Sequence, residues 1–90
     1  MAAERLSRLQ RRILHYVYAV EARSRGIMSA SHAELMHAVG GNKGNVSISL
    51  RNLEVKGLVV VFRTRGGKAE AVALTREGKN RASLLPESFD

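Results

Sequence analysis

The residues from Asn42 to Arg51 combine the side-chain types that recognise nucleic acid. Amides, hydroxyls and cations occur close together, and the first carboxylate after Asn42 is that of Glu54. Asparagine is suited to a two-point contact with adenine, and arginine reaches guanine or a phosphate. We therefore predict a surface for the major groove of DNA, formed by Asn42, Lys43, Gly44, Asn45, Ser47, Ile48 and Arg51.

A second basic cluster follows in a stretch that is typical of a β-hairpin. Two β-rich runs, Leu58–Phe62 and Ala69–Leu74, flank a short segment that contains Gly66-Gly67. Glycine adopts positive φ angles without steric cost, so the pair predicts a tight turn. We predict that three cations near the tip of this hairpin also bind DNA, namely Arg63, Arg65 and Lys68.

Two helices joined by a glycine turn would present the first cluster. Ser31 is a suitable N-cap, and Glu34 three residues later completes a capping box. Gly40-Gly41 predicts the end of this helix, while Asn42 caps the next helix and Gly57 ends it. The pattern predicts a helix-turn-helix over residues 31–57, whose second helix buries the stripe Val46, Leu50 and Leu53.

The rest of the chain supplies a first helix, a wing and a last helix. Apolar residues three or four positions apart predict a helix over residues 4–23, with the buried stripe Leu6, Leu9, Ile13, Val17 and Val20. Ile27-Met28 is a candidate edge strand, and the wing covers residues 58–74. Thr75 caps a last helix over residues 75–85, which Pro86 ends. The predicted fold class is α+β, a single winged helix-turn-helix domain over residues 1–90, with a three-helix core, a two- to three-stranded β-wing and a C-terminal helix.

The chain also resembles the core of the MarR-type and related winged-helix regulators over roughly residues 27–80. The basic hairpin carries this resemblance together with Val46-Ser47, Leu53-Glu54, Lys56-Gly57-Leu58-Val59, and Leu74-Thr75 followed by Gly78. It implies that Asn45 and Ser47 reach phosphates or base edges and that the wing contacts the backbone or the minor groove. The family often carries arginine after this serine, whereas Ile48 fits contact with a thymine methyl group. The family's long dimerisation and ligand-binding helices have no counterpart in this sequence.

Composition favours a polyanionic partner. Fifteen Lys and Arg against eight Asp and Glu give a net charge of +7, and a positive field attracts nucleic acid. The chain has no cysteine, which excludes a disulfide framework and a cysteine-based zinc site. No apolar run approaches the roughly 20 residues that span a bilayer, so we expect a cytoplasmic protein that has no membrane partner.

The sequence shows no pattern for catalysis. It lacks a nucleophile elbow, a P-loop and a plausible pair of pocket carboxylates. His32 and His37 are five positions apart and so do not share a helix face, which argues against a metal site. We therefore expect no enzyme activity, catalytic residue, metal or cofactor, and we expect no small-molecule ligand.

The leading hypothesis is sequence-specific binding of double-stranded DNA by a small, dimeric transcriptional regulator. One alternative is a plasmid, phage or transposon factor for replication or partition, and another is a winged-helix module that binds RNA or protein. Dimerisation has several candidate surfaces: an apolar seam of Leu6, Tyr16 and Val20 on the first helix, the last helix, or both. A monomer is also compatible with the sequence.

Overall fold

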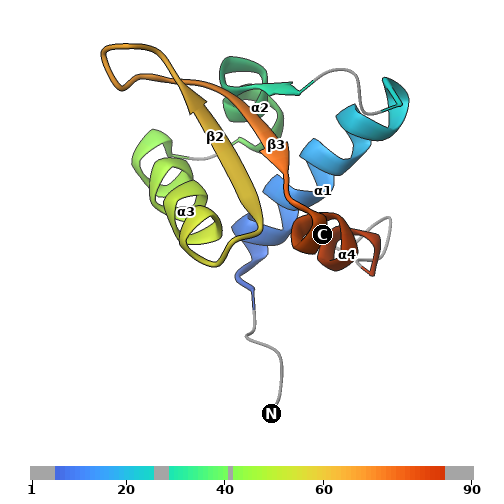
Figure 1. Ribbon diagram of the computed structural model, residues 1–90. Helices are drawn as coiled ribbons and strands as arrows, with labels where there is room; N and C mark the ends of the chain where they lie inside the picture. The colour runs from blue at the N-terminus through green and yellow to red at the C-terminus, as the bar shows by residue number, and fades with distance from the viewer. Residues whose placement is uncertain (1–5, 26–28, 41, 85–90) are drawn as a thin grey trace.

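The computed structural model describes residues 6–25, 29–40 and 42–84. Three helices precede a β-hairpin and a fourth helix follows it (Figure 1). In chain order the elements are α1 (Arg8–Arg23), β1 (Ala30–Ser31), α2 (His32–Val39), α3 (Lys43–Val55), β2 (Val59–Arg63), β3 (Ala69–Leu74) and α4 (Arg76–Ser83). This order confirms the predicted α+β winged helix-turn-helix fold class.

Helix α1 begins later than the sequence predicted. Ser7 is its N-cap: Ser7 Oγ accepts the Gln10 N–H at 3.1 Å, and Gln10 Oε1 accepts the Ser7 N–H at 2.9 Å. This reciprocal capping box satisfies backbone donors at the helix start. The predicted helix start at residue 4 falls outside the described residues, and Leu6 precedes the helix as a buried core residue. The apolar stripe therefore extends beyond the helix itself.

The three described strands form one antiparallel sheet in the order β1-β3-β2. The hairpin pairs Val59 with Leu74 and Val61 with Val72, so its strands lie within the two β-rich runs that the sequence predicted. On the other edge of β3, Ala30 pairs with Val72. Among the described residues, the third strand of the wing sheet is β1. The candidate strand at residues 27–28 lies outside the described residues.

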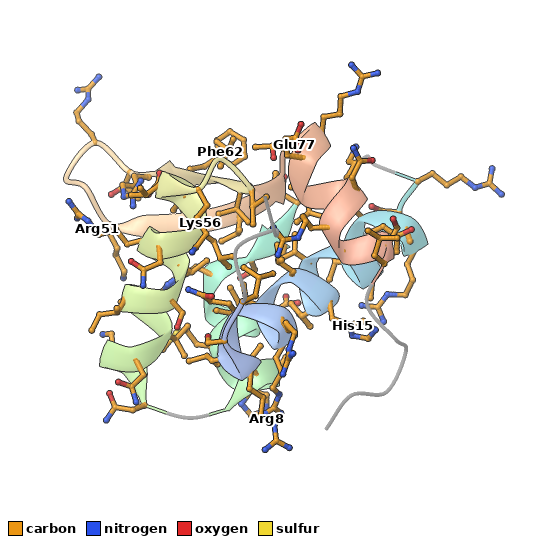
Figure 2. The ribbon with its side chains drawn as sticks, turned by 90° about the horizontal axis from the view of Figure 1, so that it is seen from below. Arg8, His15, Arg51, Lys56, Phe62 and Glu77 are labelled. Atoms are coloured by element: carbon orange, nitrogen blue, oxygen red, sulfur yellow. The ribbon has the colours of Figure 1, made fainter. Side chains whose placement is uncertain are left out.

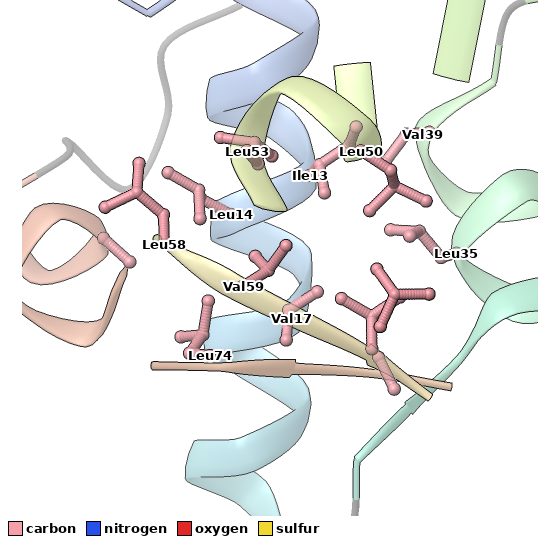
Figure 3. Close-up of a cluster of buried hydrophobic side chains, with 14 of the residues drawn as sticks. Ile13, Leu14, Val17, Leu35, Val39, Leu50, Leu53, Leu58, Val59 and Leu74 are labelled. Atoms are coloured by element: carbon pink, nitrogen blue, oxygen red, sulfur yellow. The ribbon is translucent and has the colours of Figure 1, made fainter. Parts of the chain in front are cut away.

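Leucine, isoleucine and valine fill the core, as the shortage of aromatic residues requires (Figure 3). The core cluster includes Ile13 and Val17 of α1, Leu35 of α2 and Leu53 of α3, and all four side chains are fully buried. Burying each of these side chains stabilises the fold by roughly 1.5–3 kcal/mol. The predicted α3 stripe of Val46, Leu50 and Leu53 is buried, which fixes the opposite face of α3 toward solvent.

The core also uses the apolar surface that was expected to form a dimer seam on α1. Leu6 is 6% exposed, and Tyr16 and Val20 are half-buried and packed against the core. The expectation that Leu6 belongs to a free seam is therefore wrong, because this side chain is needed inside the monomer. Tyr18 on the same helix is the exposed aromatic.

Helix α4 is attached to the end of α3 by a cap and a close backbone contact. Thr75 Oγ1 accepts the Gly78 N–H at 3.0 Å and donates to the Gly57 carbonyl at 2.6 Å, which confirms the predicted cap. A Cβ at Gly78 would overlap the carbonyl oxygen of Leu58. Glycine is therefore required at this crossing. The predicted stop at residue 86 lies outside the described residues.

A carboxylate ties the end of α1 to the sheet and to α4. Glu21 Oε2 accepts the Leu74 N–H at 2.7 Å, and Glu21 Oε1 lies 3.9 Å from Lys79 Nζ. The side chain of Glu21 is 12% exposed, so this contact joins three elements at a largely buried position.

Within the described part of the chain, no helix has the length and apolar character needed to cross a bilayer.

Candidate nucleic-acid interface

Helices α2 and α3 begin and end at the residues that the sequence predicted. Ser31 Oγ accepts the Glu34 N–H at 3.4 Å, and Gly40 at the end of α2 has a φ of 67°. At the start of α3, Asn42 Oδ1 accepts the Gly44 N–H at 2.7 Å and the Asn45 N–H at 3.4 Å. The carbonyl end of the Asn42 amide is therefore a structural cap, which orients the first turn of α3.

The side of α3 opposite the core is exposed and polar. We call the exposed side chains Lys43, Asn45, Ser47, Ile48 and Arg51 the polar face of α3. Ile48 is the apolar member of this face and is 61% exposed. Figure 2 shows Arg51 reaching from α3 on the side of the hairpin loop, whereas Arg8 and His15 lie over α1 elsewhere on the molecule.

The tip of the hairpin is a short, hydrogen-bonded loop. The Gly67 N–H donates to the Thr64 carbonyl at 2.9 Å, and the Thr64 N–H donates to the Lys68 carbonyl at 2.8 Å. Gly67 has a φ of 88°, whereas Gly66 does not have a positive φ, so one glycine of the predicted pair supplies the turn. Arg65 and Lys68 are exposed at this tip, as predicted.

Arg63 lies at the base of the tip and is engaged by α3. Its Nη1 and Nη2 atoms donate to Glu54 Oε2 at 2.9 Å and Glu54 Oε1 at 3.0 Å. The hydrogen bond from Arg63 holds the pKa of the Glu54 carboxyl below its ordinary value, and the same bond raises the pKa of Arg63. The pair thus fastens the wing to α3 and neutralises the one carboxylate of that helix.

A groove of about 720 Å³ separates α2 and α3 from the hairpin. Its lining includes apolar side chains from all three elements, such as Met36, Leu50 and Val61. Predicted site residues from both clusters line it as well, namely Lys43, Ser47, Ile48, Arg51, Arg63 and Lys68. The structure therefore brings the two clusters to one concave surface.

The remaining predicted residues lie outside this groove. Asn42, Gly44 and Asn45 are exposed at the start of α3, and Arg65 is exposed at the hairpin tip. In Figure 1 the start of α3 and the hairpin loop lie at the same end of the molecule. A long, regular polyanion is the type of ligand that can contact the start of α3 and the hairpin tip at the same time.

The groove includes a histidine that sequence reasoning did not assign to the DNA-binding surface. His32, the first residue of α2, is half-buried and lines the groove with Lys43 and Lys68. Burial lowers the pKa of His32, and the charges of Lys43 and Lys68 lower it further. Its position after the N-cap Ser31 places it on α2, but only the fold brings it near the wing.

The described residues contain no group of three or more His, Asp or Glu side chains that could hold a metal ion.

Comparison with known proteins identifies the fold through solved structures. No family model and no curated protein matches the chain. MepR, a transcription regulator of the Staphylococcus aureus multidrug efflux pump MepA, matches with a TM-score of 0.69 and 23% identity over 87% of this chain and 53% of that chain. The S. aureus MepR–DNA complex matches with the same score and identity over 87% of this chain and 60% of that chain. A point mutant of Lactococcus lactis ZitR matches with a TM-score of 0.69 and 15% identity over 92% of this chain and 52% of that chain.

These matches confirm the winged-helix fold that the resemblance to MarR-type regulators implied. The chain spans between about half and three fifths of the length of these solved chains. A further MepR structure, with 23% identity and a TM-score of 0.66, is bound to ethidium bromide. That complex stands in tension with the expectation that no small molecule binds.

Proposed function

We propose that this chain binds double-stranded DNA sequence-specifically, as a small transcriptional regulator. The observation that carries the proposal is the groove that places the polar face of α3 beside the cations of the wing. An exposed helix with amide, hydroxyl and guanidinium groups fits the major groove, where base edges are distinguishable. A wing cation at the other side of the groove would then bind the backbone or the minor groove.

Two kinds of contact are expected from α3. Asn45, Ser47, Ile48 and Arg51 point away from the core and are the residues that we assign to base edges or adjacent phosphates. Asn42, Lys43 and Gly44 form the start of the helix, where the positive end of the helix dipole and the Lys43 charge favour a phosphate. Gly44 leaves this backbone uncovered, which permits a close approach.

The wing residues have different roles in this proposal. Arg65 and Lys68 are exposed at the tip and contact phosphate or the minor groove. Arg63 is already held by both oxygens of Glu54, so we assign it primarily to positioning the wing against α3. Contacts by Arg65 and Lys68 add affinity without sequence preference, because phosphates are the same in every sequence.

The similar solved structures support a regulatory role, and the oligomeric state requires a separate measurement. MepR is a transcription regulator and has been solved with DNA, in a winged helix of the same fold. We propose a cytoplasmic homodimer, because two copies match two half-sites of a DNA site. Light scattering at the protein concentration of the binding assay measures this directly, and a monomeric mass in the DNA complex rejects the dimer.

The experiment that tests DNA binding is fluorescence anisotropy with random and selected duplexes between about 50 and about 200 mM salt. Asn45→Ala should weaken binding to the selected duplex and leave binding to random duplexes nearly unchanged. Arg65→Ala should weaken both and reduce the slope of log affinity against log salt by about one. Arg76→Ala is the matched control, because it removes an exposed arginine from α4, on the other side of α1 from α3 in Figure 1.

Several outcomes would reject the proposal. Absence of duplex binding at about 50 mM salt rejects DNA binding, since phosphate contacts are strongest at low salt. Equal binding of wild type, Asn45→Ala and Arg65→Ala rejects the polar face and the wing as the binding surface. Stronger competition by single-stranded or double-stranded RNA than by duplex DNA of the same length would favour an RNA-binding winged helix instead.

A further inference from the structure

His32 lines the same groove as two lysines. It is the first residue of α2 and lines the groove between the helices and the wing. Lys43 at the start of α3 and Lys68 at the hairpin tip line the same groove, and both charges act on the His32 imidazole. Three separate elements therefore bring their nitrogen-bearing side chains to one surface.

The surroundings of His32 contain an excess of positive charge. The charged residues that line the groove with it are Lys43 and Arg51 of α3, and Arg63 and Lys68 of the wing. On its own helix, Glu34 and His37 are exposed and are not among the groove-lining residues. No charged residue of α1 or β1 lines this groove within the described part of the chain. Glu70 of β3, the carboxylate within the wing, is exposed and does not line the groove. Glu54 of α3 is bound by Arg63.

Burial and this charge distribution both favour the neutral imidazole in the free protein. Burial and the two lysines disfavour its protonated form, which lowers its pKa below the ordinary value of 6.5. A phosphodiester reverses the balance, because its negative charge offsets the lysines and its oxygens accept a hydrogen bond from the imidazolium. The same side chain therefore has a different preferred charge in the free and DNA-bound protein.

We propose that His32, Lys43 and Lys68 together bind one DNA phosphate and that His32 takes up a proton when this phosphate is bound. The inference rests on the proposed DNA-binding function and adds a residue and a pH dependence to it. By linkage, proton uptake makes affinity rise as pH falls through the range between the two His32 pKa values. Full uptake of one proton corresponds to a tenfold change in affinity for each pH unit.

The test is the duplex dissociation constant of the full chain between about pH 5 and about pH 8, at constant salt. Wild type should bind more tightly as pH falls, with a slope approaching tenfold for each pH unit. His32→Gln should bind DNA with most of this slope removed. His32→Lys should also lose most of the slope and keep the tight binding of the low-pH wild type, because its charge is permanent in this range.

His37→Gln is the matched control, because His37 is an exposed histidine of the same helix that does not line the groove. It should retain the wild-type slope. An independent readout is the NMR titration of His32, whose pKa should be below 6.5 in the free protein and higher in the complex. Calorimetry in buffers with different protonation enthalpies should show proton uptake for wild type and markedly less uptake for His32→Gln.

The outcomes separate this inference from the proposed function. Wild type and His32→Gln that bind duplex with the same pH slope overturn the role of His32 and leave DNA binding intact. An unchanged His32 pKa in the complex has the same meaning. Absence of duplex binding at every pH overturns both proposals. A slope lost in His37→Gln as well as in His32→Gln assigns the effect to α2 as a whole and overturns the specific phosphate contact.

Discussion

Arg63 and Glu54 hold the wing against α3 through two parallel hydrogen bonds, from Nη1 to Oε2 at 2.9 Å and from Nη2 to Oε1 at 3.0 Å. Glu54 lies near the end of α3 and Arg63 at the end of β2, so the pair spans the connection between the helix and the hairpin. Two-point geometry restricts rotation more than a single contact does. The ion pair therefore helps to set the distance between the two elements that we propose bind DNA.

Glu54→Gln should loosen the wing without unfolding the protein. Because the folded-state pKa of Glu54 is lowered, its stabilisation is present above the ordinary value of 4.5 and is lost as pH falls through the lower folded value. Urea denaturation should show a small stability difference between wild type and Glu54→Gln at neutral pH, which disappears in acid. Because the pair is exposed, salt should reduce this difference. An unchanged difference in acid would contradict the role of the ion pair.

The arrangement of α2 and α3 could be predicted because its signals are local. Ser31 and Asn42 are N-cap types, and Gly40 and Gly57 adopt the positive φ angles expected at helix ends. Val46, with Leu50 and Leu53, identified the buried side of α3, and the remaining side chains then had to face solvent. The exposed candidate residues follow directly from that periodicity.

Features created by tertiary contact could not be predicted in the same way. The two-residue strand β1 is defined by pairing with β3 and has no periodic pattern of its own. Arg63 appeared to be another exposed wing cation, because nothing in the sequence indicates that the hairpin returns it to Glu54. Likewise, no local signal in the sequence indicates that His32 lines the same groove as Lys43 and Lys68.

Gly78→Ala should destabilise the fold by about 1–3 kcal/mol, since an added methyl group forces α4 away from the backbone of Leu58. Urea denaturation with an unchanged m-value measures this loss. Gly66→Ala is the control, because Gly66 has no positive φ and its added carbon would meet Thr64 Oγ1 at 4.0 Å. Equal stability of Gly78→Ala and Gly66→Ala would show that α4 can shift without cost.

Ile48 should distinguish thymine from uracil in the DNA site if its exposed side chain contacts a base methyl group. Replacing the contacted thymine by deoxyuridine removes one methyl group, which is worth about 0.8 kcal/mol or about fourfold in affinity. Wild type should show this loss in an anisotropy titration, whereas Ile48→Ala should bind both duplexes almost equally. Equal losses for the two proteins in this double-mutant cycle would place the methyl contact elsewhere.

Asn42 combines a structural cap with a place in the proposed phosphate contact, and two substitutions separate these roles. Asn42→Ala removes the acceptor of the Gly44 and Asn45 N–H groups and should cost about 1 kcal/mol of stability. Asn42→Asp retains an acceptor, and its negative charge interacts favourably with the positive end of the helix dipole. Its urea midpoint should therefore match or exceed that of wild type. Its negative charge should nevertheless weaken binding to every duplex by repelling phosphate, most strongly at low salt. If Asn42→Asp binds as tightly as wild type, the start of α3 does not face the DNA backbone, and the polar face must dock in a different orientation.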